Sequence, residues 1–170
     1  MFRQLSRRFY SFCSQAKPQV PLPSVRRNLH RAGGLLLDVA RNFQPRAVVL
    51  RVIDAMARAK LNTLHLHLTD DEGWRIDVPR FPQLAERASR RGHGLPVPPL
   101  LGSAAEPYGL VYSPADCRTL NERAAELSLA IVPEIEMPGH SFSALQALPH
   151  LRDPDDCGPY RSILNPGLSA

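Results

Sequence analysis

Side chains that can carry out acid–base or binding chemistry gather at three places in this 170-residue chain. At each place they follow directly on an apolar run of strand length, and they are Asp38 and Arg41, then Asp70 and Asp71, then Glu136 and His140. Carboxylates beside a histidine supply proton donors, proton acceptors and oxygens that bind hydroxyl groups. In parallel α/β folds, ligands bind at the carboxyl ends of the strands. The pattern therefore predicts one site on a shared rim.

The stretch from Leu64 to Arg75 carries the densest chemistry. Asp70, Asp71 and Glu72 stand together just before Gly73 and Trp74. Carboxylates this close repel, share protons, or bind a cation or sugar hydroxyls. An aromatic ring beside them suits a sugar site, because sugar ring faces stack on it while the carboxylates accept hydroxyl hydrogen bonds. Trp74 suits an ordinary core position equally well.

Two histidines alternate with leucines in the same stretch, so His65 and His67 share one face of a strand. With Asp70 and His140 nearby, they allow an alternative hypothesis, a metal-dependent TIM-barrel hydrolase. The plainer interpretation is a pair of neutral, hydrogen-bonded histidines packed between sheet and helices. We favour the plainer interpretation and assign no metal ligand. Cys13, Cys117 and Cys157 fit no zinc pattern or disulfide framework.

The elements that position these groups follow from apolar periodicity and turn residues. We expect strands at residues 35–40, 63–68 and 130–135, a helix from Pro45 to about Asn62, a helix from the N-cap Ser113 to about Ser128, and a short helix near residues 142–148. The Pro-rich residues 79–112 are expected to form a long excursion. Strand, helix, strand, helix, strand in this order predicts right-handed crossovers and a parallel α/β sheet.

The turn after the last predicted strand runs from Pro133 to His140. Gly139 permits a positive φ there, and Pro138 fixes the approach of the chain. We expect this turn to aim His140 back over the rim, where it would share the site with Glu136.

Composition narrows the classes of partner. The formal net charge is +5, but the basic excess lies before Asp38, so we expect no nucleic-acid partner. No apolar run approaches the roughly 18 residues that a membrane-spanning helix needs. Residues 1–30 form a basic leader that we expect to be disordered; its composition is similar to an organelle transit peptide, and it lacks the apolar core of a secretory signal.

Four segments in order resemble the family 20 glycoside hydrolases, the β-N-acetylhexosaminidases and chitobiases. They are residues 34–43, residues 60–75, the turn at residues 133–140, and Leu164-Asn165-Pro166. The resemblance implies a (β/α)8 TIM barrel, of which residues 31–170 would be the N-terminal part, about the first three β/α units. It also implies a lysosomal or extracellular location, which the leader does not support, so the compartment stays open.

The resemblance implies removal of terminal N-acetylhexosamine from glycans or chitooligosaccharides, with no cofactor. The substrate's acetamido group is the nucleophile in this family. An Asp orients that group, and the adjacent Glu, after a His-x-Gly-Gly-Asp-Glu pattern, is the general acid/base. The 170 residues do not contain this pattern. We therefore assign no catalytic residue and expect the chain by itself to be an inactive, non-catalytic fragment.

Carried over by position, Asp70 and Asp71 support the site and sugar hydroxyls, and His140 belongs to a hydrogen-bonded relay with the acid/base Glu. Trp74 and Glu136 are further candidates; Glu136 stands where the family usually has Asp. The family places an Arg directly before the first glycine of the first strand. Gly33 stands there, and Arg31, two residues earlier, is the remaining candidate for sugar binding. Three strands cannot close a barrel, so an unpaired edge would permit self-association.

Overall fold

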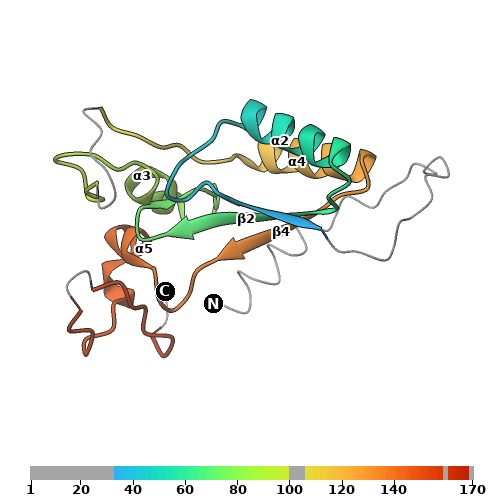
Figure 1. Ribbon diagram of the computed structural model, residues 1–170. Helices are drawn as coiled ribbons and strands as arrows, with labels where there is room; N and C mark the ends of the chain where they lie inside the picture. Colours follow the sequence, from blue (N-terminus) through green and yellow to red (C-terminus); the bar gives the residue numbers. More distant parts are fainter. Residues whose placement is uncertain (1–32, 100–105, 159–160, 169–170) are drawn as a thin grey trace.

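The computed structural model describes residues 33–99, 106–158 and 161–168. Within these ranges the chain forms a mixed α/β structure with a parallel sheet, as predicted (Figure 1). The elements in chain order are β1 (Gly34–Asp38), α2 (Arg46–Arg58), β2 (Thr63–Asp70), β3 (Gly73–Trp74), α3 (Pro82–Ala88), α4 (Pro114–Glu126), β4 (Ala130–Ile135), α5 (Phe142–Ala147) and the 3-10 turn η1 (Pro149–Leu151).

The strand β2 is the centre of the sheet. It pairs in parallel with β1 on one side and with β4 on the other, and its end folds back into the short antiparallel strand β3. The register sets Asp38, His67 and Glu134 side by side across the three parallel strands. The predicted strand positions and the parallel order are therefore confirmed.

One face of the sheet is covered by α2 and α4, which lie together along it (Figure 1). Apolar residues at helical spacing on α2 (Val49, Ile53, Met56) and on α4 (Leu120, Ala124) meet the leucines of β2. Burying one such large side chain contributes about 1.5–3 kcal/mol. This layer is therefore the main hydrophobic core of the described residues.

The other face of the sheet has no covering helix within the described part of the chain. Leu36, His65 and Val132 lie side by side on it and are 55%, 40% and 43% exposed, the value for His65 being that of its side chain. We call this side the open face. Asp38, His67 and Glu134 lie on the same side, two residues closer to the carboxyl ends of the strands.

The helix boundaries follow local chemistry. Ser113 caps α4 as predicted: its hydroxyl accepts a hydrogen bond from the backbone of Asp116, whose carboxylate accepts one from the backbone of Ser113. The first helix ends at Arg58, earlier than predicted, because the chain turns at Lys60 with a φ of 59°. Asn62, the predicted end, instead accepts a hydrogen bond from the backbone N–H of Gly33.

Residues 79–112 are not the irregular excursion that we expected throughout, because they contain α3. Pro82 opens this helix, and Leu84 and Ala88, one turn apart, pack with Leu145 of α5 in a second apolar cluster. A seven-residue helix offers too few turns for its period to stand out in sequence. The hairpin strand β3 is likewise too short to show alternation.

Candidate functional site

The carboxyl ends of the parallel strands meet in a network of charged side chains. Arg41, in the loop after β1, pairs with Asp38 at 2.8 Å and with Asp70, at the end of β2, at 2.6 Å. Burial opposes the charge of Asp38, but hydrogen bonds from Arg41 and the nearby His67 outweigh it and lower the pKa of Asp38. Burial raises the pKa of Asp70. A single guanidinium thus joins the first two strands at the rim.

Asp71 joins the end of β2 to the turn after β4. One of its oxygens lies 3.1 Å from Nδ1 of His140, and the other accepts the backbone N–H of Phe142, the first residue of α5, at 3.0 Å. The hydroxyl of Ser143 donates to the carbonyl of Asp70 at 2.6 Å. The hydrogen bond with Asp71 raises the pKa of His140. The imidazole is therefore held at the rim while its side chain stays 58% exposed.

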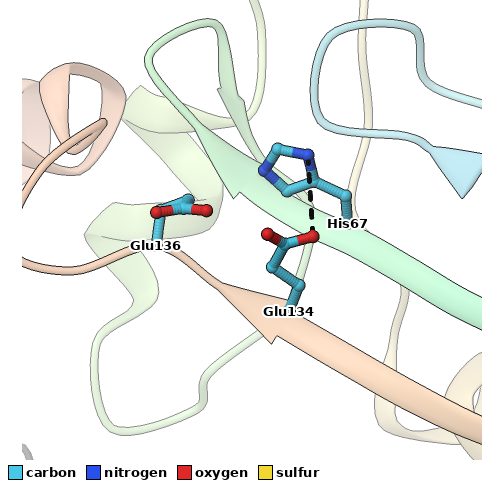
Figure 2. A group of neighbouring side chains, drawn as sticks. All are labelled: His67, Glu134 and Glu136. Carbon is cyan, nitrogen blue, oxygen red and sulfur yellow. Dashed lines mark ion pairs between the residues drawn. The ribbon is translucent and has the colours of Figure 1, made fainter. Parts of the chain in front are cut away.

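A second cluster lies on the open face, beside the first. Figure 2 shows His67 on β2 and Glu134 on β4 side by side, with the carboxylate of Glu136 directed toward them from just beyond β4. The hydroxyl of Thr69 accepts the backbone N–H of Glu136 at 2.9 Å. Burial and the neighbouring Glu134 raise the pKa of Glu136.

The structure therefore brings Asp70, Asp71 and His140 together, as expected from the sequence, and places Glu136 in the neighbouring cluster. The turn reaches this arrangement differently from our expectation. His140 itself has the positive φ, 49°, whereas Gly139 does not. Gly139 permits a positive φ, but the chain adopts one at the next residue, His140.

Trp74 lies in the core. It is 4% exposed, packs in the cluster of α3 and α5, and donates its indole N–H to the carbonyl of Ile76 at 2.7 Å. The structure thus agrees with an ordinary core tryptophan. Glu72 is also buried and pairs with Arg91. Arg31 lies outside the described residues.

The four ligands of the metal-hydrolase alternative do not form one group in the described part of the chain. His67 groups with Glu134 and Glu136, whereas Asp70 and His140 group with Asp71. His65 pairs with Glu134 at 2.8 Å. Sequence reasoning did not single out Glu134, although alternation along β4 places it on the same face as Val132.

The fold and this rim define a class of protein: α/β proteins whose chemistry lies at the carboxyl ends of parallel strands. Residues 30–163 match the model of the glycosyl hydrolase family 20 catalytic domain. The chain belongs to this family, as the sequence motifs indicated.

Individual relatives agree with that assignment. A β-hexosaminidase of Vibrio furnissii is 44% identical over 131 residues, which is 76% of this chain and 21% of that protein. An N,N'-diacetylchitobiase of Vibrio harveyi is 37% identical over 77% of this chain and 15% of that protein. A family 20 exo-β-N-acetylglucosaminidase of Vibrio harveyi, solved with N-acetylglucosamine, superposes with a TM-score of 0.74 at 36% identity, covering 80% of this chain and 22% of that one.

The chain thus spans about a fifth of the length of such relatives. Within its described ranges, the structure contains no helix that is both long and apolar enough to cross a membrane.

Proposed function

We propose that this chain supplies the first three β/α units of a β-N-acetylhexosaminidase barrel that acts on N-acetylhexosamine-terminated glycans or chitooligosaccharides. The pairing of Asp71 with His140 is the observation that carries the proposal. It links two strand ends that are distant in sequence and holds an imidazole at the rim. This agrees with the resemblance, which gives His140 a place in a relay with the acid/base Glu.

In this proposal Asp71 and His140 are positioning residues. Asp71 fixes the ring through Nδ1, and the exposed side chain leaves its other nitrogen available to a carboxylate on a further barrel unit. Because Asp71 favours the protonated imidazole, His140 would lower the pKa of that carboxylate when charged. Asp70 and Arg41 form an ion pair at the same rim, and together with Asp71 they provide groups that can hydrogen-bond to sugar hydroxyls.

We further propose that the 170-residue polypeptide by itself does not hydrolyse glycosides, because it lacks the His-x-Gly-Gly-Asp-Glu pattern. Purified chain mixed with 4-nitrophenyl N-acetyl-β-glucosaminide is expected to release no nitrophenol above buffer. Turnover that disappears in Asp71→Ala would overturn this part of the proposal.

A chimera tests the proposal that this chain supplies part of a β-N-acetylhexosaminidase barrel. In the chimera, residues 30–163 of this chain replace the matching segment of the Vibrio furnissii β-hexosaminidase. All other residues are those of the Vibrio furnissii enzyme. We expect an active enzyme in which His140→Ala lowers kcat by roughly 10²-fold, since general acid–base contributions are typically 10²–10⁴-fold. Asp54→Asn, on α2 and away from the rim, is the matched control. An active chimera whose kcat is unchanged by His140→Ala would refute the positioning role of His140.

A further inference from the structure

The proposed sugar site gives no role to His67 or Glu134, which form a cluster with Glu136. The donor atoms of this cluster all lie within 4.8 Å of one another on the open face, and the three side chains converge from β2 and the end of β4 (Figure 2). Two carboxylates this close repel each other unless they share a proton or bind a cation, and the histidine beside them adds a ligand that suits a cation.

The hydrogen bonding of His67 fixes which nitrogen faces the carboxylates. Nε2 lies 2.9 Å from the backbone carbonyl of Thr69, and a carbonyl can only accept, so Nε2 carries the proton. In the neutral ring Nδ1 is then a lone pair. It lies 3.7 Å from Asp38 and 3.9 Å from Glu134, too far for hydrogen bonds to either carboxylate. His67 is itself 6% exposed, so the ring that carries this lone pair is held in place by its surroundings.

Glu134 presents a second atom in need of a partner. Its Oε2 is shielded from solvent and, among the described residues, accepts no hydrogen bond of good geometry, although Nε2 of His65 lies 2.8 Å away. A shielded carboxylate oxygen without a well-aligned donor is costly. A cation beside it would remove that cost.

We propose that His67, Glu134 and Glu136 form a binding site for a divalent transition-metal ion of the Zn²⁺ class. One imidazole and two carboxylates form a ligand set that zinc accepts, and imidazole disfavours Mg²⁺ and Ca²⁺. The bond from Nε2–H of His67 to a carbonyl is the support that metal-ligating histidines regularly have. His65, beside Glu134, is placed to hold the ligating carboxylate.

The spacing fits such an ion after a small movement. Ligands at about 2.1 Å from tetrahedral zinc lie roughly 3.4 Å apart. The ring nitrogen and Oε2 of Glu134 are already 3.9 Å apart, so closing the site requires a shift of less than an ångström there. Glu136 has a long, rotatable side chain and is only partly buried, so rotation about its own bonds closes the rest.

Titration of metal-free full-length chain with Zn²⁺, followed by calorimetry and by the visible absorption of Co²⁺ as a substitute, tests the site. We expect one equivalent to bind. Glu134→Gln and Glu136→Gln should each weaken that binding at least tenfold, since even a supporting residue of a metal site is worth about 10–100-fold. Glu136→Asp should weaken it less than Glu136→Gln. Glu122→Gln, an exposed carboxylate on α4, should leave it unchanged.

Three outcomes would overturn the proposal: no saturable binding, binding that survives both glutamine variants, or binding lost in His140→Ala or Cys157→Ser but kept in Glu136→Gln. A melt followed by circular dichroism accompanies every variant. If Glu134→Gln fails to fold, Glu136→Gln decides, because its side chain is partly exposed and its removal leaves no buried gap. None of these measurements uses glycosidase activity, so the result stands apart from that of the proposed function.

Discussion

Replacing Arg75 by Met is expected to destabilise this fold more than any surface change. Arg75 is fully buried, and its guanidinium donates to backbone carbonyls rather than to a carboxylate. Nε reaches Val39 at 3.0 Å, Nη2 reaches Ala40 at 2.7 Å, and Nη1 bonds to Ser89 at the end of α3. One side chain thus fastens the loop after β1 and the end of α3 to the β2–β3 hairpin.

The size of the effect follows from two opposing contributions. A hydrogen bond from a charged group contributes about 1.5–3 kcal/mol, and Arg75 makes at least three such bonds to carbonyls that Met would leave unpaired. Against this, burial lowers the pKa of Arg75 from 12.5 to about 10, which corresponds to a desolvation cost of roughly 3 kcal/mol. The contribution of the hydrogen bonds is larger than the desolvation cost, and we expect Arg75→Met to lower the free energy of unfolding by about 3 kcal/mol.

Urea unfolding and thermal melts followed by circular dichroism measure this loss. For a domain of this size, about 3 kcal/mol lowers Tm by roughly 6–12 °C. Arg51→Met, on the exposed side of α2, is the matched control and should stay within about 0.5 kcal/mol. Arg75→Lys should fall between the two, because an ammonium cannot reproduce the planar fork. An Arg75→Met protein as stable as the Arg51→Met protein would refute the reasoning.

Two further predictions concern single residues. A Cβ added at Gly109, where φ is 115°, would collide with the guanidinium of Arg75. Gly109→Ala should therefore lower Tm much more than Gly94→Ala, because Gly94 has a φ of 78° but open space around it. Equal decreases in Tm would mean that backbone strain alone, and not the collision, accounts for the effect. Asp71 raises the pKa of His140, so the charged pair should stabilise the fold below about pH 6.5 and cease to do so as pH rises through the higher folded pKa. The Tm difference between the native chain and His140→Asn is therefore expected to shrink as pH rises from below about 6.5 through the raised folded pKa of His140, and a constant difference would contradict this.

The parallel sheet could be predicted because its signals are local and repeated. Leu64 and Leu66 alternate with His65 and His67, and the structure shows why: the leucines face α2 and α4, whereas the histidines face the open side. The rim was predictable for the same reason. Once the strands are parallel, the residues that follow them must meet at one edge.

What could not be predicted depends on contacts between distant segments. Trp74 had two plausible environments, and only the packing of α3 against α5 places it in the core. The partners of Arg75 are backbone carbonyls, which leave no trace in side-chain sequence. The positive φ of His140 falls on a residue type that does not signal it in sequence, and the contact of its ring with Asp71 joins residues 69 positions apart.

His67 contacts residues of both acidic clusters, so the role of each cluster must be tested with variants of other residues. Its Nε2 lies 2.9 Å from the carbonyl of Thr69 and 3.4 Å from Asp70 of the rim, while Nδ1 faces Glu134 on the open face. Removing His67 would therefore disturb both clusters and leave a gap where a buried side chain stood. Glu134→Gln, which changes the group of His67, Glu134 and Glu136, is the better variant for this comparison. Glu136→Gln changes both clusters, because Asp71 and, less strongly, Glu136 raise the pKa of His140. A change in metal binding without a change in the pH dependence conferred by His140 would show that the two clusters act independently.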